Sequence, residues 1–237
     1  ALADSLGEIL RRHEILRTVF PERDGEPMQV VLPLTPIAID ERNLEGFAAQ
    51  TRETEARRIA NEAAVRTFDL ARGPPVRFML LRLGAHEHVL LMMMHHIVFD
   101  GWSEAIFLDE LSVLYAAFCE RRPLPLSDPP LQYSDFAAWE QRRSNDGAFD
   151  AHLSYWRHRL RNLPSALALP TDFPRPTASR SRGGSVSFTL DHDASSALIA
   201  FARAERLTPF MVLLGAFQVV LGRYASQEDV LVGVPAA

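Results

Sequence analysis

The chain has 237 residues, of which 47% are hydrophobic and 23% are charged, and its formal net charge is −5. This balance is typical of a globular protein with one large domain or two modest ones, and it argues against binding to nucleic acid or to an anionic membrane surface. No apolar run reaches the roughly 18 residues of a membrane-spanning helix, and no signal-peptide pattern opens the chain.

The single cysteine, Cys119, excludes an internal disulfide and favours a reducing compartment, so we expect a cytoplasmic location. Its surroundings, LYAAFCE, have a helical pattern, and we interpret Cys119 as a packing residue rather than a nucleophile. The chain lacks an initial methionine and opens inside a helical pattern, which indicates an excerpt of a longer protein.

Helices and strand pairs alternate through the first half of the chain. The dipeptide Asp24-Gly25 between two apolar segments is a hairpin signal. Apolar residues follow one another in the second of the two long strands, which suits a central strand covered on both faces. In order, we expect a helix at 2–13, a hairpin at 16–32, a helix at 46–66, strands at 74–83 and 87–98, and a helix at 102–122 capped by Asp100 or Ser103.

The second half of the chain contains a change in composition. Residues 169–184 are rich in Pro, Ser, Arg and Gly, which is typical of a linker between lobes. Around this linker we expect helices at 132–143, 149–163, 193–206 and 208–225, and strands at 185–190 and 229–237.

The mixture of strand pairs and helices predicts an α/β or α+β fold with two lobes. We expect a first lobe at 1–168, an interlobe linker at 169–184 and the start of a second, truncated lobe at 185–237.

Two adjacent histidines follow an apolar run in LLMMMHHIVFDGWS, residues 90–103. Adjacent strand residues point to opposite faces, so His95 and His96 cannot both face one cleft from a regular strand. This disfavours a metal site, as does the lack of another Cys/His cluster with ligand spacing. A hydrogen-bonded pair of core histidines is the structural alternative. Asp100 and Gly101 favour a functional interpretation, because a glycine permits close approach and an imidazole suits general-base catalysis.

The stretch HHIVFDGWS resembles the HHxxxDG signature of the condensation domains of nonribosomal peptide synthetases. This signature is shared with a wider acyltransferase superfamily that includes chloramphenicol acetyltransferase. Other segments are similar to further blocks of the family, in the same order: RHEILRTVF (12–20), YSDFAAWEQ (133–141), LPTDFPRP (169–176) and the segment from 208 to 237, which ends in VGVPAA. The resemblance therefore runs along the whole chain.

The resemblance implies a V-shaped, two-lobed fold like that of chloramphenicol acetyltransferase, with the first lobe nearly complete and the second only begun. The active site would lie in a tunnel where the lobes meet. There, an aminoacyl amine attacks an acyl or peptidyl thioester, and both substrates hang from phosphopantetheine arms of carrier proteins. The implied partners are an upstream donor and a downstream acceptor carrier domain and an adjacent adenylation domain, with no cofactor bound by the domain itself. We expect the 237-residue chain alone to be inactive.

The resemblance implies that His96 faces the tunnel as a base or as a group that orients the amine, and that His95 faces a packed layer. Gly101 would let a substrate arm pass close to the backbone, where N–H groups could bind the developing oxyanion. Trp102 and Ser103 begin the next helix, and Trp102 is interpreted as a packing residue.

The resemblance also implies that Asp100 pairs with an arginine and shapes the site. Arg12 and Arg17 are the candidates, and the sequence leaves open which of them reaches Asp100. The alternative for both arginines is a solvated charge.

Two other functions remain open from the sequence. One is a related HHxxxDG acyltransferase or an epimerisation domain; epimerisation domains tend to have DGVSW, and this chain has DGWS. The other is an inactive condensation-like domain that docks other proteins, for which loss of the second histidine would be the signal. His96 is present.

Overall fold

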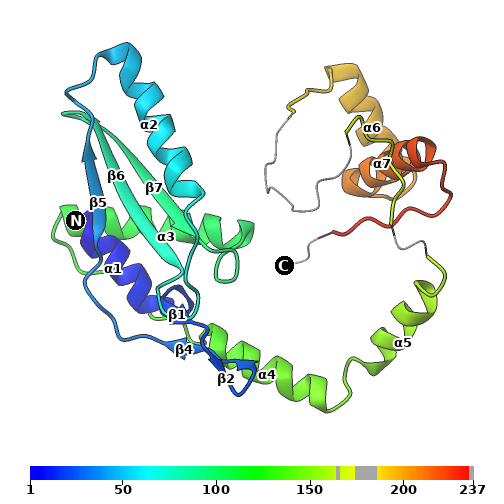
Figure 1. Ribbon diagram of the computed structural model, residues 1–237, viewed down its shortest axis with the longest axis horizontal. Helices are drawn as coiled ribbons and strands as arrows, with labels where there is room; N and C mark the ends of the chain where they lie inside the picture. Colours follow the sequence, from blue (N-terminus) through cyan, green and yellow to red (C-terminus); the bar gives the residue numbers. More distant parts are fainter. Residues whose placement is uncertain (164–165, 174–185, 235–237) are drawn as a thin grey trace. The chain divides into compact units, whose positions relative to one another are not determined.

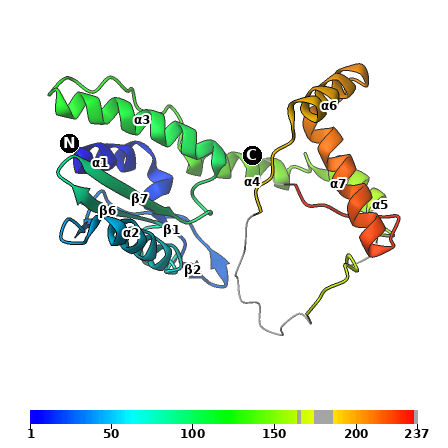
Figure 2. The same cartoon turned by 90° about the horizontal axis from the view of Figure 1, so that it is seen from above.

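The computed structural model describes residues 1–163, 166–173 and 186–234, and the chain divides into two units (Figures 1 and 2). The first unit is Ala1–Ala148 and the second begins at Phe149. This division falls earlier than the predicted end of the first lobe at residue 168. Much of the predicted linker at 169–184 lies outside the described residues, so the lobe boundaries stay a prediction.

The first unit contains the predicted helices, hairpin and two long strands, and also a 3-10 helix at 14–17 and a strand at 39–43 that were not predicted. The elements of this unit are α1 (Leu2–Arg12), the 3-10 helix η1 (Glu14–Arg17), β1 (Thr18–Val19), β2 (Glu22–Arg23), β3 (Glu26–Pro27), β4 (Val30–Val31), β5 (Ile39–Asn43), α2 (Ala49–Ala64), β6 (Val76–Gly84), β7 (Glu87–Met94), α3 (Gly101–Cys119) and α4 (Tyr133–Asn145).

The predicted hairpin is confirmed. Strand β2 pairs with β3 and β1 pairs with β4, both antiparallel. Asp24 and Gly25 form the turn with φ values of 55° and 84°. Two successive residues with positive φ are typical of a type I′ turn, for which Asp-Gly is a favoured pair.

A three-stranded sheet with the order β5-β6-β7 forms the centre of the unit. Helices α1 and α3 cover one face and α2 covers the other (Figure 2). Strand β6 serves both faces by alternation: Val76 and Phe78 pack with α1 and α3, whereas Leu81 and Leu83 pack with α2.

The expectation that the second long strand would be central is wrong for the described residues. Strand β6 is central, and β7 pairs with β6 on one edge only. The side chains of Leu90 to Met94 are half-buried, and those of residues 87–89 are exposed. A continuous apolar run indicates that side chains on both faces of a strand are covered. It does not indicate whether one or two neighbouring strands hydrogen-bond to that strand.

The second unit contains α5 (Asp150–Arg159), α6 (His192–Ala204) and α7 (Pro209–Ala225). Thr208 caps α7 by accepting a hydrogen bond from the Met211 N–H at 3.2 Å, and Pro209 occupies the first turn. After α7, the chain turns back so closely that a Cβ on Gly222 would lie 2.9 Å from the Gln227 carbonyl oxygen. This position therefore requires glycine.

The two strands predicted for the second lobe are not found. Residues 186–190 and 229–234 have no regular structure, and residues 185 and 235–237 lie outside the described part of the chain. Their β-type patterns have no neighbouring strand to pair with among the described residues, and a strand is formed by such pairing. No single helix in the described ranges is long and apolar enough to span a membrane; α6 and α7 pass that test only as a pair bent by 106°.

A buried ion pair joins α1 to α3. Two guanidinium nitrogens of Arg12 contact the two carboxylate oxygens of Glu110 at 2.9 and 3.2 Å, and the Arg12 side chain is only 5% exposed. Arg12 also donates to the Ser127 carbonyl, and the His13 Nε2 lies 2.8 Å from Glu110. Burial raises the pKa of the Glu110 carboxyl, but hydrogen bonds from Arg12 and His13 outweigh it and hold this pKa below its ordinary value.

Gln132, the residue just before α4, adds two hydrogen bonds to the residues around this ion pair. The side-chain nitrogen of Gln132 donates to the Arg12 carbonyl at 2.9 Å, and its side-chain oxygen accepts from the Glu14 N–H at 3.1 Å. The RHE block of the sequence therefore joins three elements that are far apart in the chain.

We expect Glu110→Gln to lower the free energy of unfolding by about 3 kcal/mol, because it leaves the buried Arg12 charge without its partner. Urea denaturation of the complete domain measures this change. The matched control is Glu53→Gln, which removes an exposed pair with Arg57 on α2 and is expected to cost at most ~0.5 kcal/mol. Equal losses in the two variants would contradict a structural role for the buried pair.

The same pair predicts a pH dependence. Because the pKa of Glu110 is lower in the folded than in the unfolded protein, its stabilisation is present above the unfolded pKa and is lost as the pH falls through the folded pKa. In Glu110→Gln this part of the acid sensitivity is expected to disappear, which urea melts at several acidic pH values would detect.

Candidate active site

The histidine pair lies in a turn directly after β7, not within the strand. Strand β7 ends at Met94, and residues 96–98 form the turn that leads to α3. The expected alternation of side chains along a strand therefore does not apply to His95 and His96. The conformation of the turn gives the two imidazoles their different surroundings.

His95 is held by the residues around it. Its N–H donates to the Pro75 carbonyl at 2.9 Å, and its ring Nδ1 accepts from the Ile97 N–H at 3.1 Å. The ring also lies edge-on to Phe68, with a centroid distance of 6.0 Å. An Nδ1 that accepts a hydrogen bond carries no proton, so this contact selects the Nε2–H tautomer of neutral His95. These contacts give His95 a role in shaping the turn.

His96 is exposed, in contrast to His95. Its imidazole interacts electrostatically with the Asp100 carboxylate and contributes to lowering the pKa of that group. An exposed imidazole is accessible to a substrate, and it lies near the start of α3. Among the described residues, His95 is thus held by its neighbours and His96 is accessible.

Asp100 is the N-cap of α3, one of the two capping residues that the sequence offered. Its Oδ1 accepts from the Ser103 N–H at 2.8 Å and from the Ser103 hydroxyl at 2.7 Å. The hydrogen bonds from the side chain and backbone of Ser103 come first among the causes that hold the pKa of Asp100 below its ordinary value. The carboxylate therefore stays ionised at the start of the helix.

In the part of the chain that the structure describes, Asp100 forms no ion pair with Arg12 or Arg17, the two expected candidates. Arg12 pairs with Glu110, and Arg17 contacts Glu14 at 3.1 Å and the carbonyls of Leu10 and Leu32. Asp100 is also half-buried rather than largely buried. The physical reason is competition, because the first turn of α3 offers hydrogen-bond donors two and three residues from Asp100, whereas each arginine has nearer partners.

Gly101 and Trp102 both face open space. A Cβ on Gly101 would meet no atom within 4 Å, so the described residues do not require a glycine there. Trp102 is 74% exposed, which contradicts its interpretation as a packing residue. Asp100 accepts from the N–H and hydroxyl of Ser103 and from the Trp102 N–H, so of these first N–H groups only that of Gly101 is left for another acceptor. The open surface at Gly101 leaves room for a group from outside these residues.

Two residues that the sequence analysis missed support the histidine turn. The Arg77 guanidinium lies over the Phe68 ring at 4.0 Å from its centroid, and Phe68 also contacts His95. This is a cluster of a cation, an aromatic ring and an imidazole behind the turn. An arginine inside the buried strand PPVRFMLLRL was the signal that could have drawn attention to it.

A small apolar cavity of about 110 Å³ connects two of the motifs. It lies between η1 and the start of α3, next to the Asp100 cap. Its wall consists of His13, Ile15, Leu16, Val98, Phe99, Ser103, Ile106 and Phe107. The RHEILRTVF block and the HHIVFDGWS block therefore form one wall together.

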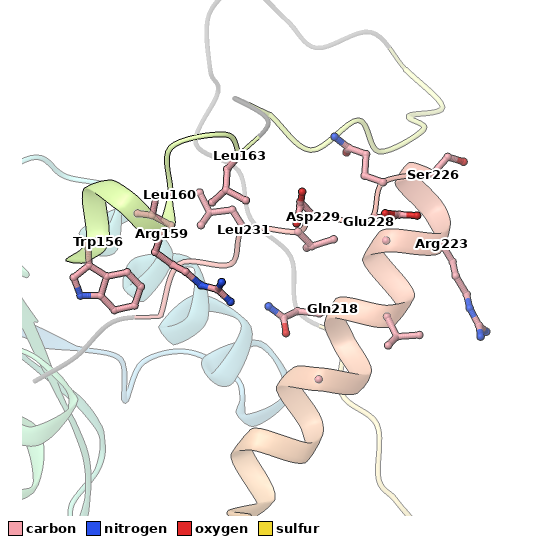
Figure 3. Close-up of a pocket in the computed structure, with 15 residues that line it drawn as sticks. Trp156, Arg159, Leu160, Leu163, Gln218, Arg223, Ser226, Glu228, Asp229 and Leu231 are labelled. Atoms are coloured by element: carbon pink, nitrogen blue, oxygen red, sulfur yellow. The ribbon is translucent and has the colours of Figure 1, made fainter. Parts of the chain in front are cut away.

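A larger cavity, of about 800 Å³, belongs to the second unit (Figure 3). Arg159 from the end of α5 and Gln218 from α7 point toward the space between these helices, with Leu160, Leu163 and Leu231 along one side (Figure 3). None of the predicted site residues lines this cavity. Within the described ranges, no group of three His, Cys, Asp or Glu side chains is arranged to hold a metal ion.

We expect Asp100→Ala to lower the melting temperature of the complete domain, because it removes the cap from the first turn of α3. Asp100→Asn is expected to retain most of the stability, since asparagine is an equally good N-cap. Thermal melts followed by circular dichroism make the comparison. If Asn proved as damaging as Ala, the charge of Asp100 rather than its capping bond would be the stabilising feature.

Comparison with known proteins places the chain in a family. The family model described as "Condensation domain" matches residues 1–237. The chain is 42% identical over 232 residues to chondramide synthase cmdD of Chondromyces crocatus, covering 98% of this chain and 6% of the synthase. It is 39% identical over 237 residues to malpinin synthetase of Mortierella alpina, covering 100% of this chain and 3% of the synthetase.

A solved structure gives the same result for the fold. The X-domain in the complex of the X-domain and OxyB from teicoplanin biosynthesis is similar, with a TM-score of 0.84 and 27% identity, over 97% of this chain and 50% of that one. The chain thus spans half of that structure and only a small part of the two large enzymes. The predicted α/β fold class and the resemblance read from the motifs are both confirmed: this chain belongs to the condensation-domain family.

Proposed function

We propose that this chain is part of a nonribosomal peptide synthetase condensation domain that forms amide bonds. One observation carries the proposal: in a chain of this family, the accessible His96 lies beside the capped start of α3, where Gly101 leaves open space. The substrates are an acyl or peptidyl thioester and an aminoacyl thioester, each held on the phosphopantetheine arm of a carrier domain.

The proposed reaction is an acyl transfer from sulfur to nitrogen. The acceptor amine attacks the donor carbonyl carbon, the new C–N bond forms and the C–S bond breaks. The nitrogen must lose a proton, which His96 accepts or helps to direct, and the leaving sulfur ends as the thiol of the donor arm. Positioning of the two arms also contributes to the rate, because it holds the amine and the thioester close together in the orientation for attack.

Gly101 has the second catalytic role in this proposal. It lies at the first position of α3, where the positive end of the helix dipole and an N–H group favour a negative oxygen. Asp100 occupies the N–H groups of Ser103 and Trp102, so the oxyanion would bind at the Gly101 N–H. His95, Asp100, Trp102 and Ser103 shape this surface, and Arg12 and Arg17 act at a distance by fixing the helices.

The partners follow from the same chemistry. An upstream donor carrier and a downstream acceptor carrier deliver the substrates, and an adjacent adenylation domain loads the acceptor. We further propose a cytoplasmic location, for which the lone Cys119 gives support. The lobes are proposed to be residues 1–168 and 185 onward, with the linker between them.

Docking without catalysis is the second candidate function. It is favoured by the likeness to the teicoplanin X-domain, which forms a complex with OxyB. The DGWS sequence and the presence of His96 favour condensation over epimerisation and over docking. A condensation assay with two loaded carrier proteins, read by mass spectrometry, distinguishes the three functions, because only condensation yields a lengthened acceptor.

We expect His96→Ala in the complete domain to lower the rate of condensation by roughly 10²- to 10⁴-fold, the range typical of a positioned acid–base group. Single-turnover product formation with preloaded carriers measures it. The matched control is His88→Ala, an exposed histidine on β7 that is expected to leave the rate unchanged. His95→Ala is expected to act mainly on stability, since its ring is held by Ile97 and Phe68.

Two outcomes would contradict this assignment. A well-folded His96→Ala domain with the wild-type rate would remove His96 from the chemical step. A folded His95→Ala domain with the same loss of rate as His96→Ala would exchange the roles of the two histidines. Melting curves of each variant decide whether a loss of rate comes from unfolding.

A further inference from the structure

The residues at the start of β6 contact the histidine turn by two routes. Through the main chain, the His95 N–H donates to the carbonyl of Pro75, whose side chain is fully buried. Through side chains, the Arg77 guanidinium lies 4.0 Å from the centroid of the Phe68 ring, and that ring lies edge-on to the His95 imidazole at a centroid distance of 6.0 Å. Arg77 is therefore linked to the turn through one aromatic ring.

Arg77 is placed unfavourably for stability. Its Nε is buried and has no hydrogen-bond partner among the described residues. Burial, and then the charge of Arg66, lower the pKa of Arg77, so its surroundings disfavour the cation. One terminal nitrogen donates to the carbonyl of Arg66, a residue that is exposed to water. A buried donor without an acceptor lowers the stability of the fold, so the presence of this arginine calls for another explanation.

The contacts of Arg77 favour a role in positioning. A guanidinium over the face of the Phe68 ring restricts the plane of that ring, and the ring in turn restricts the rotation of the His95 imidazole. A restricted imidazole keeps its Nδ1 directed to the Ile97 N–H, at 3.1 Å. This hydrogen bond spans His96, because it joins the residue before it to the residue after it. The series of contacts therefore ends by fixing the backbone at His96.

We propose that Arg77 is a positioning residue for condensation, which acts on His96 through Phe68 and His95. The inference rests on the proposed function, in which His96 takes part in the chemical step. Because Arg77 acts through the conformation of the turn, it is expected to affect the reaction of bound substrates and not their affinity. Its buried charge is then retained for the geometry of the turn and not for the stability of the fold.

We expect Arg77→Met in the complete domain to separate rate from stability. The kcat for condensation should fall by about 10-fold, part of what a misplaced catalytic group can cost, with the KM for the loaded acceptor carrier unchanged. The melting temperature should stay at or above that of the wild type, because methionine fills the space without a buried donor. Steady-state rates with loaded carriers and melts followed by circular dichroism measure the two quantities. A merely structural arginine would lower both together.

Further variants test each link between Arg77 and His96. Phe68→Leu removes the ring and should lower kcat as Arg77→Met does, whereas Phe68→Tyr retains the ring and should keep most of the rate. His95→Asn supplies a side-chain oxygen that can accept from the N–H two residues later, so it should retain activity. In the His95→Asn background, Arg77→Met should have little further effect, because its route to His96 is absent. The matched control is Arg82→Met on the same strand, where Arg82 pairs with Glu45 at 3.2 Å, and it should leave kcat unchanged.

A spectroscopic measurement tests the positioning without any turnover. NMR spectra of the complete domain with ¹⁵N-labelled histidine report which ring nitrogen of neutral His95 carries the proton, and His95→Asn assigns the signals. The wild type should show the Nε2–H tautomer, since Nδ1 accepts from Ile97. In Arg77→Met and in Phe68→Leu, the less restricted ring should populate both tautomers.

Three results would overturn the inference. They are a wild-type kcat in folded Arg77→Met, a melting temperature that falls together with the rate in both Arg77→Met and Phe68→Leu, and a His95 tautomer that neither variant alters. Failure of the proposed function gives a different result, because His96→Ala would then keep the wild-type rate while Arg77→Met still altered the tautomer of His95.

Discussion

The buried ion pair between Arg12 and Glu110 is the constraint on which the candidate site depends. Helix α3 begins with the Asp100 cap and carries Glu110 further along, where the helix packs against α1. Arg12 is 5% exposed and Glu110 14% exposed, so a displacement of either helix would leave a largely buried charge without its partner. The pair thus fixes α3 against α1, and with it the position of Gly101 beside His96.

The sheet adds a second constraint from the opposite side. Strand β6 packs residues on both faces, and the start of this strand reaches the histidine turn through the Pro75 carbonyl and the cluster of Arg77, Phe68 and His95. These contacts hold His95 in place, whereas His96 is exposed. The two adjacent histidines thus combine an anchored side chain with an accessible imidazole, and this difference supports the proposed role of His96.

Features of local origin were predictable, whereas features that need distant partners were not. The helices, the Asp24-Gly25 turn and the two long strands follow from spacing, capping and turn chemistry within a few residues. The strands expected at 185–190 and 229–237 were wrong in their described parts, since a strand pattern forms no ladder without a neighbour. The edge position of β7 was likewise not predictable, because hydrophobicity reports burial of faces and not pairing of edges.

The sequence by itself determined the family, through the HHxxxDG stretch and four further blocks in the right order, and it singled out His96 as the residue to test. Only the tertiary structure decided the partners of the charges. Arg12 pairs with Glu110 across 98 residues of chain, and Asp100 accepts from Ser103 three residues away. Arg77 lies over the Phe68 ring, which in turn contacts His95. The partner of a charged side chain depends on distances in the folded chain and on competition from water and backbone groups. The order of the residues determines neither of these.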